Sequence, residues 1–237
     1  MICLALDTAG SEGGVALAEF DGAGNLLPQS VFSRMLPPRE VSRLLIPAIS
    51  ELLAEANCVP ADIDCLAAVR GPGSFTGIRV GLAAVKGMAD ARACPVLGVS
   101  RLALLTAAGR AATGNAVTPA YSVLDAGRGE FYVGAFAAGA LLAETEGVAT
   151  YATLQEKLRA APAPVFGCEP GVLHTLAGCS PQSPVAVPAP GVMDLLPFVA
   201  LARAGARGLR FVSADLLSAN YVRHAYPLPT APASSAR

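Results

Sequence analysis

Two aspartates occupy positions at which a carboxylate could help to hold a metal ion beside a phosphate. Asp7 ends an apolar run that begins at Ile2, and Thr8 and Gly10 follow it. Asp125 ends a second apolar run and is also followed by a glycine-containing turn. A carboxylate can bind a cation, and the backbone N–H groups of a glycine turn can bind an anion such as a phosphate. Asp7, Thr8 and Asp125 are therefore a candidate nucleotide site, working or vestigial, unless each aspartate only orders its own turn.

A glycine-rich segment from Arg70 to Leu82 reads R-G-P-G-S-F-T-G-I-R-V-G-L. Its Gly-Pro-Gly start predicts a sharp turn, because proline fixes one dihedral angle and glycine permits the others. Ser74 or Thr76 can then cap a helix, and the free N–H groups at such a helix start could hold an anion. The lysine of a phosphate-binding loop is missing, since Gly-Lys-Ser/Thr does not occur in the chain.

The helix that follows this turn carries small residues on one face, at Gly77, Gly81 and Ala84. An interior glycine costs about 1 kcal/mol relative to alanine, so two on one face need a compensating gain. Close approach of a neighbouring helix would supply it. That neighbour is either a helix of the same chain, predicted at 40–56, or a helix of another subunit, and the pattern leaves both open.

Metal chemistry has little support in the sequence. The chain has two histidines, His174 and His224, and neither lies in a cluster of Cys, Asp or Glu with ligand spacing. The His-Glu-x-x-His motif of zinc peptidases is also missing. We therefore expect no metal site on this chain, with His174 on a helix surface and His224 near a loose tail.

The composition predicts a compact globular protein. Hydrophobic residues make up 53% of the chain and charged residues 15%. The net charge is −1 and no basic cluster appears, whereas a protein that binds a nucleic acid on its own usually carries a basic face.

No apolar run reaches about 18 residues, so no membrane span is expected. The start of the chain has no basic leader, and six scattered cysteines are expected to be buried thiols of a cytoplasmic protein.

Strands and helices alternate along the first part of the chain. An antiparallel hairpin is predicted from runs at 2–6 and 15–20. A helix follows at 40–56, which Pro47 should kink or split. The remaining predicted elements are a strand at 65–69, a helix through about 91, a strand at 95–99 and a helix at 102–110 that begins with Ser100.

The second part repeats the order strand, aspartate, glycine turn, strand at 121–136. A helix at 153–160, a strand at 165–168 and a helix at 195–207 follow. This alternation predicts an α/β fold made of a duplicated βββαβα unit, with two ribonuclease-H-like halves in the manner of the actin/Hsp70-like ATPases. The expected domains are 1–104 and 105–223, with a loose tail at 224–237.

The segment from Gly71 to Leu82 resembles the signature of the bacterial TsaB (YeaZ) family. Shorter and less specific motifs of the family occur in the same order between Ile2 and Arg223. They are Leu4 to Thr8, Pro38-Arg39-Glu40, Asp125 with Arg128-Gly129-Glu130 and Tyr132, and Tyr221-Val222-Arg223. Two positions depart from the family pattern. Val41 stands where many relatives have histidine, and Gly127 stands where the family has arginine.

The resemblance implies a subunit that does no chemistry itself. In the family, TsaB pairs through its N-terminal domain with its paralogue TsaD. TsaD transfers a threonylcarbamoyl group to the adenosine beside the anticodon of tRNA, and the ATPase TsaE joins the two proteins. ATP and metal would then belong to the partner subunits, tRNA would be reached only through the complex, and the chain could also form a homodimer. The implied interface residues are Val41, Leu44, Leu45, Gly73, Ser74, Phe75, Thr76, Gly77, Arg79, Gly81 and Ala84.

Two other functions remain as alternatives. A small-molecule kinase or ATPase of the actin-like superfamily would use Asp7 and Asp125 at the strand ends. A glycopeptidase-type metallopeptidase, an old label for the family, would need bound metal.

Overall fold

The computed structural model describes residues 1–178 and 183–222 of the 237-residue chain. The predicted loose tail at 224–237 lies outside the described residues, as do Cys179, Arg223 and His224. None of the helices in the described ranges is long and apolar enough to cross a membrane.

The first sheet has five strands in the order β3-β2-β1-β4-β5. They are β1 Ile2–Asp7, β2 Gly13–Phe20, β3 Leu26–Leu36, β4 Cys65–Val69 and β5 Val96–Val99. The first three pair antiparallel, which confirms the predicted hairpin, and β4 and β5 join them in parallel. The helices of this half are α1 Val41–Glu55, α2 Phe75–Arg92 and α3 Arg101–Thr113.

Helix α1 is continuous through Pro47, so the prediction that this proline splits the helix is wrong. Its apolar stripe of Leu45, Ala48, Ile49, Leu52 and Leu53 is buried, and the helix packs on β2 and β3. Pro47 lies on the exposed side. The carbonyl that proline leaves without a helical partner can therefore meet water, and packing of the opposite side holds the helix together.

The second half repeats the same strand order, β8-β7-β6-β9-β10 when read from its antiparallel edge. Its strands are β6 Ala120–Gly127, β7 Glu130–Phe136, β8 Thr145–Thr150, β9 Val165–Gly167 and β10 Val185–Ala186, and its helices are α4 Tyr151–Ala160, α5 Pro170–Ala177 and α6 Leu196–Arg203. The duplicated fold of two ribonuclease-H-like halves is thus confirmed. Strand β6 runs past Asp125 through a bulge, and α6 ends at Arg203, short of the predicted 207.

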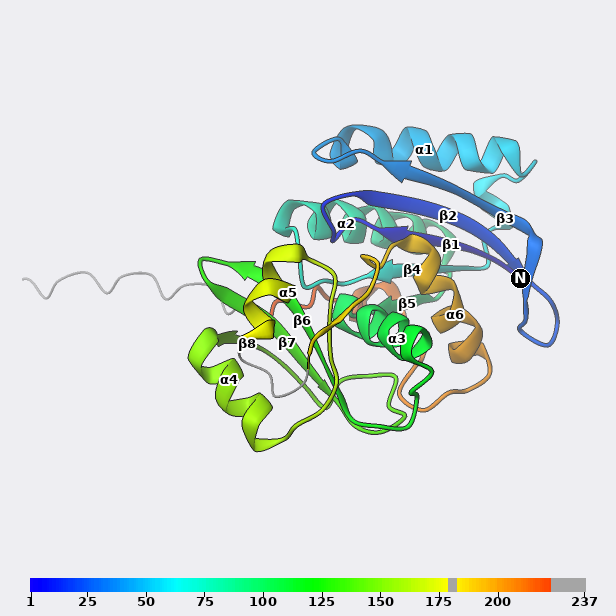
Figure 1. Ribbon diagram of the computed structural model, residues 1–237. Coiled ribbons are helices and arrows are strands. Elements are labelled where there is room, and N and C mark those ends of the chain that lie inside the picture. Colours follow the sequence, from blue (N-terminus) through cyan, green and yellow to red (C-terminus); the bar gives the residue numbers. More distant parts are fainter. Residues whose placement is uncertain (179–182, 223–237) are drawn as a thin grey trace, which may run out of the picture.

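The two halves exchange helices across the centre of the molecule (Figure 1). Helices α1 and α2 pack on the first sheet, and α4 and α5 pack on the second. Helix α3 leaves the first half and packs on β6, β7 and β9, whereas α6 packs on β3 and β5. The predicted boundary after residue 104 falls inside α3, and one apolar core continues from the first sheet through α3 to Phe136 and Phe166. Below, the first lobe is the first sheet with α1 and α2, and the second lobe is the second sheet with α4 and α5.

The contact between α3 and the second sheet should be very sensitive to size. A Cβ on Gly109 would lie 2.2 Å from the ring of Phe166, which is 1% exposed and cannot move aside. We expect Gly109→Ala to lower the free energy of unfolding by about 1–3 kcal/mol. Gly87, another glycine inside a helix, has no atom near its Cβ position. Gly87→Ala should stabilise the chain by up to about 1 kcal/mol. Urea unfolding of both variants measures this, and equal effects would contradict the packing described.

Candidate functional site

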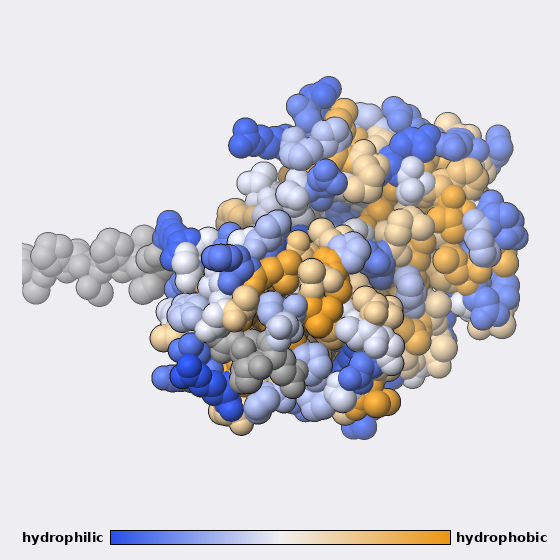
Figure 2. All heavy atoms as spheres, in the orientation of Figure 1, coloured by the Kyte–Doolittle hydropathy of each residue, from blue (hydrophilic) through white to orange (hydrophobic). Residues whose placement is uncertain are grey.

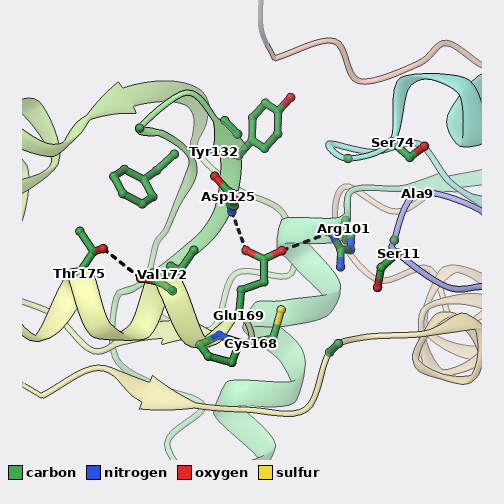
Figure 3. A pocket seen from close by; sticks show the side chains of 18 residues that line it. Ala9, Ser11, Ser74, Arg101, Asp125, Tyr132, Cys168, Glu169, Val172 and Thr175 are labelled. Carbon is green, nitrogen blue, oxygen red and sulfur yellow. Dashed lines mark hydrogen bonds and ion pairs between the residues drawn. The ribbon is translucent and has the colours of Figure 1, made fainter. Parts of the chain in front are cut away.

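A cleft of about 810 Å³ lies between the two lobes. On the first-lobe side it is lined by the β1–β2 turn at Gly10 and Ser11 and by Ser74 at the start of α2. On the other side it is lined by residues of β6, β7 and α5, including Asp125 and Tyr132 (Figure 3). Of the three residues predicted for a nucleotide site, Asp125 belongs to this lining.

Asp7 is not among the residues that line this cleft. Its side chain is 2% exposed, and Oδ1 accepts the backbone N–H of Ala9 at 2.9 Å. Burial raises the pKa of Asp7 from its ordinary 3.8 to about 6, although the Ala9 N–H and the charge of Arg101 act in the opposite direction. The carboxylate therefore orders its own turn, which is the second of the two uses considered for it.

Asp125 does line the cleft, but its carboxylate also serves a turn. Oδ1 accepts the backbone N–H of Gly127 at 2.7 Å. The backbone N–H of Asp125 donates to Glu169 Oε2 at 2.6 Å. Thr8, the third residue of the predicted nucleotide site, is 3% exposed and packs against α2. The structure thus brings one of the three residues to the cleft surface.

A charged pair that the sequence did not predict links the start of α3 to the second lobe. Arg101, at the start of α3, is 7% exposed, and its Nη1 lies 4.0 Å from Glu169 Oε1 (Figure 3). Burial raises the pKa of Glu169, while the Asp125 N–H and Arg101 oppose that rise. Nothing in the spacing of these residues signals the pair, because Arg101 follows β5 in one half and Glu169 precedes α5 in the other.

The glycine-rich segment packs against the backbone of the β1–β2 turn. A Cβ on Gly73 would lie 2.0 Å from the carbonyl oxygen of Ala9, and one on Gly77 would lie 2.0 Å from that of Thr8. A Cβ on Gly81 would lie 2.2 Å from Thr8 Oγ1. The prediction that Gly77 and Gly81 leave room for a neighbouring helix is therefore wrong. The close approach is to a turn of the same chain.

The start of α2 confirms Ser74 as the helix cap. Its Oγ accepts the backbone N–H of Gly77 at 3.1 Å, and its own N–H donates to the carbonyl oxygen of Ala9 at 2.9 Å. The turn that precedes the helix is therefore fixed both to α2 and to β1–β2. This arrangement leaves the side chains of the next residues, Phe75 and Thr76, exposed.

The predicted interface residues divide by exposure. Leu45, Gly77 and Gly81 are buried, so they support the surface without forming it. Val41, Leu44, Gly73 and Ala84 are partly exposed, and Ser74, Phe75, Thr76 and Arg79 are exposed. A hollow of about 510 Å³ lies between the starts of α1 and α2, with Val41, Thr76 and Val80 in its lining. Figure 2 shows hydrophilic side chains interspersed with apolar ones over α1, at the top of the molecule.

Comparison with known proteins identifies the family. The family model of TsaD, tRNA N6-adenosine threonylcarbamoyltransferase, matches residues 36–162, more than half of the chain. YeaZ from Pseudomonas aeruginosa is 32% identical in a match that covers 91% of this chain and 96% of that one, with a TM-score of 0.67. A second solved structure, an uncharacterized protein with similarity to peptidase YEAZ from Pseudomonas aeruginosa, is 31% identical. That match covers 94% of this chain and 99% of the other, with a TM-score of 0.72.

The chain belongs to the TsaB/YeaZ family. A curated relative is the tRNA threonylcarbamoyladenosine biosynthesis protein TsaB of Escherichia coli K12, 37% identical over 132 residues. That match covers 56% of this chain and 53% of the relative, so the chain spans about half the length of the curated relatives it matches.

The structure gives a local account of both departures from the TsaB/YeaZ pattern. Val41 packs against β2, because a Cβ on Gly13 would lie 2.9 Å from its Cγ2, and it also lines the hollow beside α2. An apolar side chain there extends the apolar surface. Gly127 has φ +73°, a value at which a side chain is strained, and its N–H donates a hydrogen bond to Asp125.

Among the described residues, no group of three or more His, Cys, Asp or Glu side chains could hold a metal ion.

The buried carboxyl of Asp7 should make stability depend on pH. Its pKa is raised in the folded state, so the unfolded chain releases the proton first and the folded chain loses stability as pH rises from about 4 through about 6. A shift of about two pH units corresponds to roughly 3 kcal/mol. We expect the loss between pH 4 and 7 to shrink in Asp7→Asn, whose amide oxygen can still accept the Ala9 N–H. Urea unfolding at both pH values measures this, and an unchanged pH dependence would show that burial of Asp7 is not its cause.

Proposed function

We propose that the chain is a non-catalytic partner subunit in the biosynthesis of threonylcarbamoyladenosine in tRNA. It docks a TsaD homologue as a heterodimer through the surface at the starts of α1 and α2, and the ATPase TsaE joins the complex. The observation that carries this proposal is the exposed surface of Phe75, Thr76 and Arg79 beside the hollow lined by Val41. Family membership and the match to the TsaD model support the choice of partner.

The tight packing of α2 supports docking because it makes the exposed surface at the helix start rigid. Gly73, Gly77 and Gly81 bind the helix start so closely to the β1–β2 turn that this part of the surface is held rigid. A rigid surface loses little conformational entropy on binding and so gains affinity. Interface anchors are enriched in aromatic residues and arginine, and both types are exposed at the start of α2. The same surface is open to a second copy of the chain, so a homodimer in the absence of TsaD belongs to the proposal.

Cofactors belong to the partner subunits in this proposal, and tRNA is reached only through the complex. The net charge of −1 agrees with a chain that does not hold RNA on its own. A kinase or ATPase would need a catalytic acid that is free in the cleft. Asp7 lies beneath the β1–β2 turn, and the carboxylate of Asp125, which does line the cleft, accepts the backbone N–H of Gly127. A cytoplasmic location is part of the same proposal.

Binding to the TsaD homologue of the same organism tests the docking surface. Thr76→Arg places a bulky charge beside the hollow on an exposed position, so the fold should be unaffected while the complex is blocked. We expect the Kd measured by isothermal titration calorimetry to rise at least tenfold. Val117→Arg is the matched control, since Val117 is 78% exposed and lies between α3 and β6.

Two results would contradict the proposal. One is a folded Thr76→Arg variant that binds the TsaD homologue as tightly as the unchanged chain. The other is the lack of any complex with the unchanged chain at micromolar concentrations.

A further inference from the structure

Three exposed side chains gather at the first turn of α2. Phe75 is 55% exposed and Tyr221 is 47% exposed, and their ring centroids lie 5.7 Å apart. The guanidinium carbon of Arg79 lies 3.7 Å from the centroid of the Phe75 ring. Arg79 Nε donates to the hydroxyl of Tyr221 at 3.0 Å. Below, these three residues are called the arginine stack.

Tyr221 reaches α2 from the far end of the described chain because its segment is tied down on both lobes. The N–H of Asn220 donates to the carbonyl oxygen of Arg70 at 2.8 Å. Its side-chain amide contacts Ser100 Oγ at 3.5 Å and also donates to Glu146 on β8. The backbone next to Tyr221 is therefore held by contacts outside α2, while its side chain meets Phe75 and Arg79 on α2.

The stack leaves one edge of Arg79 available. A guanidinium has five N–H donors in a planar fork, and here Nε is used by Tyr221 while Phe75 covers one face. Among the described residues, no acid forms an ion pair with Arg79. Its two terminal nitrogens thus point a fixed pair of donors away from Tyr221. Such a pair matches the two oxygens of a carboxylate.

We propose that the arginine stack is a preorganised receptor for one carboxylate of an Asp or Glu side chain on the docked TsaD homologue. Phe75 and Tyr221 fix the guanidinium before binding, so less side-chain entropy is lost when the carboxylate arrives. Tyr221 becomes a positioning residue of the interface, although it lies outside the surface inferred from the sequence. This inference rests on the proposed function.

A protein carboxylate fits this receptor better than an RNA phosphate. Surfaces that hold a nucleic-acid backbone carry several cations, whereas Arg79 stands beside aromatic and hydroxyl side chains. The stack also adjoins Thr76 and the partly apolar hollow between α1 and α2. A polar anchor beside apolar surface is the usual composition of a protein interface.

Substitutions at Arg79 test the receptor with the TsaD homologue of the same organism as the probe. We expect Arg79→Gln to raise the Kd at least tenfold, and Arg79→Lys to restore little of it, because an ammonium keeps the charge but loses the paired donors and the stacking. Arg207→Gln, at an exposed arginine beyond α6, should leave the Kd unchanged and controls for loss of one positive charge.

Tyr221→Phe separates positioning from simple contact. Loss of the hydroxyl should raise the Kd about threefold or more in the unchanged background and have no effect in the Arg79→Gln background, since the hydroxyl acts through Arg79. A second readout is chemical cross-linking of the Arg79→Lys variant. The variant is mixed with enough TsaD homologue to saturate it and is then treated with a carbodiimide, which joins an amine to a nearby carboxylate. Mass spectrometry should find the introduced amine linked to an Asp or Glu of the partner.

The failures are distinguishable. Unchanged affinity in Arg79→Gln, with Thr76→Arg still blocking the complex, would overturn the receptor and leave the docking surface intact. Lack of any cross-link from the introduced amine, while the chain's own lysines do cross-link, would also overturn it. A loss of tRNA binding in Arg79→Gln without a change in TsaD affinity would assign the stack to a phosphate instead. No complex with the unchanged chain would overturn both proposals.

Discussion

The backbone of Thr8 and Ala9 lies so close to helix α2 that no side chain fits between them. Gly73, Gly77 and Gly81 are the residues that allow this contact, since a Cβ on any of them would overlap the turn or the Thr8 side chain. Ser74 adds a hydrogen bond to Ala9 and caps the helix. The first turn of α2, its exposed side chains and the edge of the cleft all take their positions from this one packing interaction.

The same contact accounts for the position of Asp7. The turn that α2 covers is the turn whose N–H group Asp7 accepts, so the carboxylate is shielded from the cleft and its pKa is raised by burial. Across the cleft, Glu169 holds the backbone of Asp125 and faces Arg101. The two lobes are thus joined through α3, which carries Arg101 and contributes to the continuous apolar core.

Much of the fold could be predicted from the sequence because periodicity and turn residues are local signals. The β1–β2 hairpin, the strand β4 and the repeat around Asp125 follow from them. The glycines at 77 and 81 correctly signalled a close approach, but not its partner, because Thr8 is distant in the sequence. Arg101 with Glu169, and Arg79 with Tyr221, could not be found for the same reason: each pair is assembled by the fold from separate elements, and no spacing encodes it.

We propose that the chain acts by docking a TsaD homologue at the starts of α1 and α2. Hydrogen–deuterium exchange of the whole chain, with and without the TsaD homologue, tests it most directly because every face is observed at once. We expect slower exchange on binding at residues 41–47 and 74–80 and no change in α4 or α5. Protection confined to α4 and α5, or none at all under conditions in which the complex forms, would contradict it.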